Sequence, residues 1–359
     1  MMRSYNKTLL LFLLQPISMV ANIPFAEKVT KEIHKEINVN PDATVKIENQ
    51  FGNVNIITWE QNKVVMDIQI TVEGRSLTKI KDRLDDINIE FDLSPSLVAA
   101  ITEVNDYWSM SWIRSSKVNY KINYTIKMPA TNHLDLSNDY GVISLNYLEG
   151  GATISCDYGK MIIGELFALN NKLSFDYTSN SSIEYIAGGE INADYSGFEI
   201  TEAGFIDLNS DYTSSYFEII DSLEYKNDFG KLKIENARSV KGKGDYLTFQ
   251  LNEITEYLGL NNEFGSIRIA HVSPSTKAVI IESEYTGIQI GIAPEWPFLF
   301  EFDLEFAGLK ASMDLEFEKQ IINSTEKYYK GFYIKSNAKN KLTIDSEFGS
   351  VKLYPSPKN

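Results

Sequence analysis

The sequence predicts an all-β chain that winds as a parallel β-solenoid, with stacked coils of about 17–21 residues. A short phrase of an acid, an aromatic residue and a small residue recurs, as in Asp139-Tyr140-Gly141 and Asp228-Phe229-Gly230. From Tyr140 to Phe264, the aromatic residues of this phrase lie 18, 19, 18, 17, 17, 17 and 18 residues apart. A near-constant period this short is typical of solenoids, in which each repeat packs on its neighbours. An antiparallel β-sandwich that pairs alternate strands could show the same period and is the alternative.

Alternation within each repeat predicts two short strands per coil. In Leu173-Ser174-Phe175-Asp176-Tyr177 the odd-numbered residues are apolar, so we expect all three to face the core. The alternation slips by one residue after the aromatic, which indicates a corner at the glycine or small residue that follows it. A second turn, as at 148–151 or 186–189, would return the chain. The aromatic residues would then form an internal structural column of Tyr140, Tyr158, Tyr177, Tyr195, Tyr212, Phe229, Tyr246, Phe264 and Tyr285.

The same alternation places the acid before each aromatic residue on the outer surface, as a stripe with carboxylates about 4.8 Å apart. Neighbouring charges at this spacing repel by roughly 0.9 kcal/mol in water, and a solvated face that opposes aggregation is the simplest interpretation. The functional alternative is a linear site for Ca²⁺ or a basic partner, although single carboxylates supply few of the oxygen ligands that Ca²⁺ prefers. The candidate residues are Asp139, Asp157, Asp176, Asp194, Asp211, Asp228, Asp245, Glu263 and Glu284.

Residues 1–21 are predicted to be a secretory signal peptide. Arg3 and Lys7 precede a mostly apolar run from Thr8 to Val20, and this order is typical of export signals. The run is shorter than the roughly 20 residues that a membrane-spanning helix needs, so no membrane-spanning segment is expected. We therefore expect an exported protein, in the periplasm or at the cell surface.

Residues 27–130 are expected to hold the first rung and a cap. After a polar lead-in at 27–45, residues 46–58 repeat the coil pattern with Phe51-Gly52 at its corner. Trp108–Trp112 reads as a loop. Such a block would cover the open end of the solenoid, since an unpaired flat edge invites aggregation. Apolar periodicity predicts a helix over 76–86 and strands over 64–72, 87–93, 100–104 and 118–128.

Residues 131–313 are expected to form the regular solenoid, and residues 314–359 an insertion followed by a closing rung. The aromatic spacing lengthens to 21 residues after Phe264, and Phe306 and Phe348 lie 42 residues apart. The spacing therefore predicts that the segment 314–341 is an insertion that leaves the regular path of the solenoid. The closing rung would then be residues 341–353.

The charge balance argues against nucleic acids and anionic membrane surfaces as partners. The chain has 49 acidic and 34 basic residues, for a formal net charge of −15, whereas phosphate recognition needs basic patches. Cys156 is the only cysteine, so no internal disulfide can form. Its position in the repeat matches those of Phe175, Ala193 and Ser210, which predicts a small buried side chain.

No catalytic or cofactor motif is recognisable in the sequence. His34, His133 and His271 are isolated, without metal-ligand spacing, and no nucleophile elbow or phosphate-binding loop occurs. Gly242-Lys243-Gly244 lies within a repeat and reads as a corner rather than a phosphate site. Some β-helices act on glycans, but they need acids clustered with Arg or Lys in a cleft, whereas here one acid recurs uniformly. We therefore expect no enzyme activity, with a glycan-active enzyme as the lesser alternative, and no cofactor.

A family resemblance is carried by residues 40–54 with Trp59, 72–74, 123–129, 134–141 and 348–353. These segments resemble the putative adhesin family of bacterial envelope proteins, a domain of unknown function, in its Bacteroidetes-type variant. The resemblance spans nearly the whole chain after residue 26 and implies a right-handed β-solenoid, export and no established enzymatic activity. It implies no binding residues, and the family does not require an acid before the aromatic residue.

These observations predict a noncatalytic exported protein that serves as an adhesion or interaction surface of the cell envelope. Its partner would be an envelope protein or a glycan. The alternative is a periplasmic sensory or regulatory component of an envelope-stress circuit. A gene beside a sigma or anti-sigma factor would favour that alternative.

Overall fold

The computed structural model describes residues 26–105 and 118–357, which form 26 strands, all joined in one mixed sheet, and one short helix. The prediction of an all-β chain is confirmed. Within these residues no helix has the length and apolar character needed to cross a bilayer. The predicted signal peptide, residues 1–21, and the predicted loop at Trp108–Trp112 lie outside the described residues.

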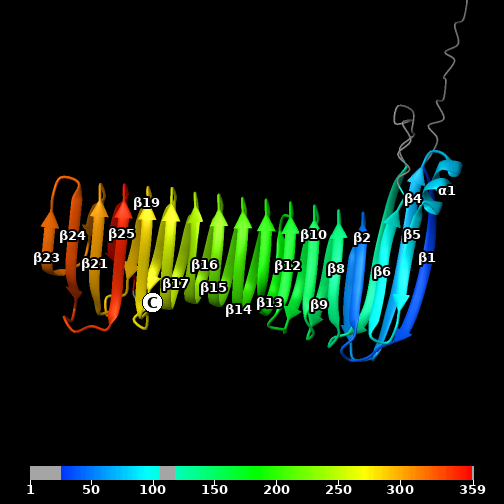
Figure 1. Ribbon diagram of the computed structural model, residues 1–359, viewed down its shortest axis with the longest axis horizontal. Helices are drawn as coiled ribbons and strands as arrows, with labels where there is room; N and C mark the ends of the chain where they lie inside the picture. Colours follow the sequence, from blue (N-terminus) through cyan, green and yellow to red (C-terminus); the bar gives the residue numbers. More distant parts are fainter. Residues whose placement is uncertain (1–25, 106–117, 358–359) are drawn as a thin grey trace, which may run out of the picture.

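Most strands stack in parallel into an elongated body (Figure 1). We call one turn of the chain, with a strand on each side of an aromatic corner, a rung. Each strand pairs with the equivalent strand of the next rung, about one sequence period later. On one side of the stack, β8 (His133–Asp139) pairs with β10 (Ala152–Asp157) and β10 with β12 (Asn171–Asp176); on the other, β9 (Val142–Leu148) pairs with β11 (Lys160–Leu166).

In the middle of the body, five longer strands run without a break through the second corner of the rung. Their register skips single residues there, such as Glu184 and Ala187 between β13 and β14, so the turn expected at 186–189 is a bend within a strand. Gly242-Lys243-Gly244 lies inside β16, and its interpretation as a corner is wrong. The five strands are β13 (Ser181–Asp194), β14 (Gly197–Asp211), β15 (Ser214–Asp228), β16 (Lys231–Asp245) and β17 (Thr248–Glu263).

The core fills the inside of the rungs with residues in matching positions. Leu173 and Phe175 are buried as expected. Cys156 is buried too and pairs in register with Phe175, which pairs with Ala193, and Ala193 with Ser210. The predicted structural role of Cys156 is therefore confirmed. Burial and the charge of Asp157 raise the pKa of its thiol to about 12, so the reactive thiolate is disfavoured at neutral pH.

The N-terminal block extends both sides of the stack. The first rung is β2 (Thr44–Gln50) and β3 (Val54–Trp59), which pair in parallel with β8 and β9 as predicted. Beyond them, β5 (Ile87–Leu93) and β6 (Leu97–Val104) continue one side, while β7 (Asn119–Pro129) and β4 (Lys63–Gly74) continue the other. Helix α1 (Leu77–Asp85) packs Ile80 into the core. The strands and helix predicted for the insertion are confirmed.

The polar lead-in at 27–45 is corrected by the structure, which places a twelve-residue edge strand, β1 (Glu27–Asn38), antiparallel to β4. Val29, Ile33 and Ile37 pack partly against the core, but Lys31 and Lys35 interrupt their row. The interruption hides the period of two that marks a strand. Lysine on an edge strand opposes pairing with other chains.

The C-terminal rung lies between two earlier rungs, so the expectation that 341–353 closes the end is wrong. On one side, β25 (Asn340–Glu347) pairs with both β19 (Ala278–Glu284) and β21 (Phe298–Glu305). On the other, β26 (Ser350–Pro355) lies between β20 (Gly287–Ile292) and β22 (Gly308–Ala311), while β18 (Ser266–Val272) joins β17 to β20. The insertion predicted at 314–341 is an antiparallel hairpin, β23 (Glu316–Ile322) and β24 (Glu326–Tyr333), which extends the sheet beyond β21 (Figure 1).

The residue after each aromatic lies close to the backbone of a neighbouring rung. A Cβ at Gly141 would lie 1.7 Å from the carbonyl oxygen of Gly52, and one at Gly159 would lie 2.2 Å from that of Gly141. In other rungs a residue with a hydroxyl group takes this position, and its oxygen accepts a backbone N–H from the preceding rung. Thr178 N–H donates to Ser196 Oγ at 3.1 Å, and Ser196 N–H donates to Thr213 Oγ1 at 3.1 Å. Small residues here let successive rungs approach.

We expect Gly141→Ala to lower the free energy of unfolding by about 1–3 kcal/mol, because the added methyl group must push two rungs apart. Gly197→Ala is the matched control, since its Cβ would meet nothing closer than Ser214 O at 3.9 Å. Urea denaturation of both variants measures the difference. Equal stability of the two variants would contradict the close approach.

Candidate interaction surface

The aromatic residue of each repeat sits at a corner of the rung with its side chain exposed, so the predicted internal column is wrong. Twelve such side chains are 38–52% exposed. The cause is the backbone, which has φ between +48° and +57° at all twelve. This left-handed conformation turns Tyr177 out of the alternation that buries Leu173 and Phe175. We call the twelve residues the aromatic ridge: Phe51, Tyr140, Tyr158, Tyr177, Tyr195, Tyr212, Phe229, Tyr246, Phe264, Tyr285, Phe348 and Phe306.

Neighbouring rings of the ridge stack face to face. Their centroids lie 4.7–5.1 Å apart and their planes are within 2–11° of parallel. The stack follows spatial order, so Phe348 lies between Tyr285 and Phe306. One aromatic pair contributes about 0.5–1.5 kcal/mol beyond burial, while a left-handed backbone costs a non-glycine residue roughly 1–2 kcal/mol. Stacking therefore offsets much of the strain at the corner.

The acids that precede the ridge residues connect successive rungs. Asp176 Oδ1 accepts the Asp194 N–H at 3.2 Å, and Asp194 Oδ1 accepts the Asp211 N–H at 2.9 Å. Tyr177 N–H donates to the Asp194 carbonyl oxygen at 3.1 Å, and this backbone bond recurs along the ridge. The predicted outward stripe is thus half-buried over most of its length and partly engaged. We call it the acidic row: Asp139, Asp157, Asp176, Asp194, Asp211, Asp228, Asp245, Glu263, Glu284, Glu347 and Glu305.

Charges within the acidic row oppose one another. Burial and the charge of Asp157 raise the pKa of Asp139. Burial and the charges of Asp157 and Asp194 also raise the pKa of Asp176, against the opposing effect of the Asp194 N–H. Among residues 26–105 and 118–357, no three His, Cys, Asp or Glu side chains form a group that could hold a metal ion. Weak Ca²⁺ binding along the row stays a prediction.

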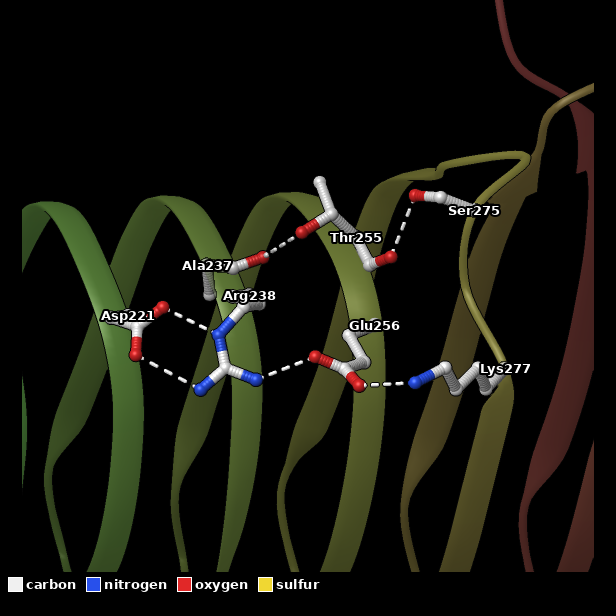
Figure 2. Close-up of polar contacts among 7 residues, drawn as sticks. All are labelled: Asp221, Ala237, Arg238, Thr255, Glu256, Ser275 and Lys277. Atoms are coloured by element: carbon white, nitrogen blue, oxygen red, sulfur yellow. Dashed lines mark hydrogen bonds and ion pairs between the residues drawn. The ribbon is translucent and has the colours of Figure 1, made fainter.

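At the second corner, a chain of ion pairs crosses four rungs (Figure 2). Arg238 donates to both carboxylate oxygens of Asp221, at 2.5 and 2.9 Å, and to Glu256 Oε2 at 2.5 Å. Lys277 Nζ lies 2.5 Å from Glu256 Oε1. The hydrogen bond from Arg238 lowers the pKa of Asp221, and those from Lys277 and Arg238 lower the pKa of Glu256. Two cations and two anions balance here, so this corner is not an open charged site.

A hollow of about 550 Å³ lies over β14 to β17 and β19. Its lining includes the exposed side chains of Lys226, Lys241 and Lys243 and the half-buried Tyr257. Sequence reasoning missed this site, because it considered Lys243 only within a presumed corner. The available signal was the recurrence of lysine at equivalent strand positions of two consecutive repeats.

Comparison with known proteins gives weak likenesses only. No protein-family model matches the chain, and no curated protein sequence matches it. Solved structures that are similar to it include a putative cell adhesion protein from Clostridium sporogenes, with 12% identity, coverage of 91% of this chain and 100% of that one, and a TM-score of 0.20. Two others are from Parabacteroides distasonis. One is a putative adhesin (10% identity, 90% of this chain, 97% of that one, TM-score 0.28), and the other is a putative lipid binding protein (10% identity, 91% of this chain, 96% of that one, TM-score 0.29). These values assign the chain to no family, and the functional argument rests on its geometry.

We expect Tyr212→Ala to lower the free energy of unfolding by about 1–3 kcal/mol, because it removes two stacked contacts. Tyr212→Gly is expected to be more stable than Tyr212→Ala by about 1 kcal/mol, since glycine adopts positive φ without penalty. Urea denaturation of both variants measures this order.

Tyr216 in β15 is the matched control, because its φ is not positive. At an ordinary strand position glycine is less favourable than alanine, so Tyr216→Gly should be less stable than Tyr216→Ala. If the glycine variant were more stable than the alanine variant at both positions, or less stable at both, the left-handed corner at Tyr212 would be contradicted.

The raised pKa of Asp176 predicts a pH-dependent effect of Asp176→Asn. A raised carboxyl pKa means that the folded chain favours the protonated form. Its contribution to stability is present below the ordinary pKa of 3.8 and is lost as the pH rises through the raised value. Asparagine keeps the accepting oxygen without the charge, so we expect a higher melting temperature than wild type at pH 7 and a smaller gain near pH 3.

Thermal melts from pH 3 to 7 test this expectation, and added salt should shrink the gain at pH 7. Repulsion is roughly 0.9 kcal/mol per neighbouring carboxylate in water and grows with partial burial, because burial lowers the effective dielectric constant. Asp92→Asn, at an exposed position of β5 outside the row, is the control. A pH-independent gain in Asp176→Asn would contradict the repulsion.

Proposed function

We propose that this chain is an exported, right-handed β-solenoid that serves, without catalysis, as an adhesion or interaction surface of the bacterial cell envelope. The parallel register of the rungs supports this proposal, because it produces one long body with repeated side chains along each face. Such a body can contact a partner at many points at once. Export and envelope placement are part of the proposal and follow from the N-terminal sequence.

The observation that carries the proposal is the exposed aromatic ridge. Isolated surface aromatics are ordinary, but a continuous apolar feature of this length marks an interaction site more often than not. Aromatic side chains are also enriched at protein interfaces. Stacking covers the faces of the rings, so their edges and the tyrosine hydroxyls are the parts that meet a partner.

The acidic row beside the ridge favours a partner that carries Lys or Arg. The net charge of −15 would speed the approach of a basic surface. Carboxylates of the row that accept a backbone N–H through one oxygen keep the other oxygen for such a partner. The ridge would then supply apolar contact and the row would supply charge.

The proposal invokes binding alone, because the candidate acid–base residues are scattered. His34 Nδ1 lies 2.6 Å from Asp67, His271 Nδ1 lies 2.7 Å from Ser356 Oγ, and His133 Nδ1 accepts the Gly151 N–H at 3.1 Å. Each histidine thus contacts a different part of the described chain. The contact of His271 joins a base to the Ser356 hydroxyl, but Ser356 is buried. Among the described residues, no recorded hydrogen bond orients the His271 ring through its other nitrogen, as a catalytic pair requires.

The test is binding of the full chain to immobilised envelope fractions, measured by biolayer interferometry. The triple variant Asp194→Asn, Asp211→Asn and Asp228→Asn is expected to bind at least tenfold more weakly, since it removes three charges and keeps the accepting oxygens.

The matched control is Glu184→Gln, Glu199→Gln and Glu218→Gln, which removes three exposed charges from the same strands β13, β14 and β15. It is expected to bind like wild type. Equal losses in both triple variants, or no loss in the acidic-row triple variant, would contradict the proposal.

A further inference from the structure

We propose that the hollow over β14 to β17 and β19 binds an acidic carbohydrate, namely a pyranose unit that carries a carboxylate. The inference goes beyond the proposed function, because it adds a second site, for an acidic ligand, apart from the acidic row that favours a basic partner. The volume of about 550 Å³ falls within the range of roughly 300–1,000 Å³ found for small-molecule sites.

Three lysines line the hollow without a recorded ion pair. Lys226 and Lys243 lie in register on β15 and β16, and Lys241 lies two residues before Lys243. Glu224 is in register with Lys241, yet none of the three lysines is in the ion pairs found among the described residues. Like charges in opposed positions of a sheet destabilise it. An anionic ligand would relieve this repulsion.

The second corner of the same rungs shows the contrast. There Arg238 and Lys277 are neutralised by Asp221 and Glu256 within the chain (Figure 2). A chain with a net charge of −15 has an excess of carboxylates for pairing its lysines. At the hollow, three acids (Asp207, Glu224 and Glu282) equal the three lysines in number, so the lining carries no net formal charge. None of these acids forms an ion pair with the lysines among the described residues, so the ammonium groups are left for an external anion.

Tyr257 supplies an aromatic wall. A Cβ at Gly259 would lie 2.8 Å from Tyr257 Oη and 3.1 Å from its Cε1, so the ring leans along its own strand over the space that a side chain at 259 would fill. Lys241 is in register with Gly259, which brings the ring and the ammonium group to the same gap. Aromatic side chains pack against the C–H bonds of pyranose rings, while the ammonium group would pair with a carboxylate on the sugar.

The position of the hollow in the sheet argues for a glycan rather than a peptide. β16 pairs in parallel with β15 and β17, and β17 pairs with β19. Backbone groups there are already used in ladders, whereas peptide addition to a sheet needs a free edge. Recognition must come from side chains. At the margin, Asn261 Nδ2 donates to Glu282 Oε2 at 3.2 Å, which orients amide and carboxylate oxygens that can accept hydrogen bonds from sugar hydroxyls.

The test is calorimetric titration of the full chain with a galacturonic acid trimer and, in parallel, with a neutral galactose trimer. The acidic trimer is expected to bind at least tenfold more tightly than the neutral one, with an affinity that falls as salt is added. Lys241→Met combined with Lys243→Met should weaken binding of the acidic trimer tenfold or more. Lys172→Met, at the equivalent outward position of β12, should leave it unchanged.

Gly259→Ala tests the aromatic wall without removing a charge. The added methyl group displaces the Tyr257 ring, so binding should weaken severalfold while the circular dichroism spectrum and the melting temperature stay near those of wild type. Tyr257→Phe keeps the ring and should keep most of the affinity. Unchanged binding in Gly259→Ala would overturn the role of Tyr257.

Three outcomes would overturn the proposal itself. They are equal binding of the neutral trimer, equal binding of sulfate or acetate alone, and no binding of either trimer. The proposed function is separable from these outcomes, because it is judged by the binding of the acidic-row triple variant to envelope fractions. That triple should bind the acidic trimer like wild type, since it changes no residue of the hollow.

Discussion

The repeated corner, an aromatic residue with a left-handed backbone stacked on its counterparts, is the constraint on which the rest of the structure depends. A single Tyr or Phe with φ near +50° is strained, but in register with others it gains a stacked contact on each side. Its N–H donates to a carbonyl oxygen of the next rung, and the carboxylate of the acid before it accepts an N–H from that rung. The small residue after it allows the two rungs to approach closely. Each part of the acid–aromatic–small phrase therefore needs the equivalent part of the neighbouring rung.

The regular features could be predicted from the sequence because they recur. The spacing of the aromatics anticipated which residues pair, such as Cys156 with Phe175, and local periodicity located α1 and the strands of the N-terminal insertion. Burial of the ridge could not be judged in the same way. Alternation reports the side a residue faces only while φ stays negative, and an aromatic side chain gives no local sign of a positive φ. The slip after Tyr177 was visible, but it belongs to the aromatic residue itself rather than to the residue that follows.

Features that depend on the order of rungs in space were not predictable from one sequence. The place of β25 between β19 and β21 requires the chain to pass over one position and return to it, and the spacing of 42 residues between Phe306 and Phe348 indicated only that an excursion occurs. The hollow combines lysines from two rungs with the missing side chain of Gly259 on a third. The acidic row, in contrast, was visible as a repeat, but its bonds to the next rung were not.

Nitration of the native chain with tetranitromethane, followed by mass spectrometry of each tyrosine, tests the exposed stacked corner most directly. The ridge tyrosines are about half exposed, whereas Tyr225 and Tyr124 are buried. The account predicts that Tyr140, Tyr177 and Tyr212 react at rates within severalfold of their rates in the unfolded chain, while Tyr225 and Tyr124 are protected. Protection of the ridge tyrosines to the same degree as Tyr225 would contradict it.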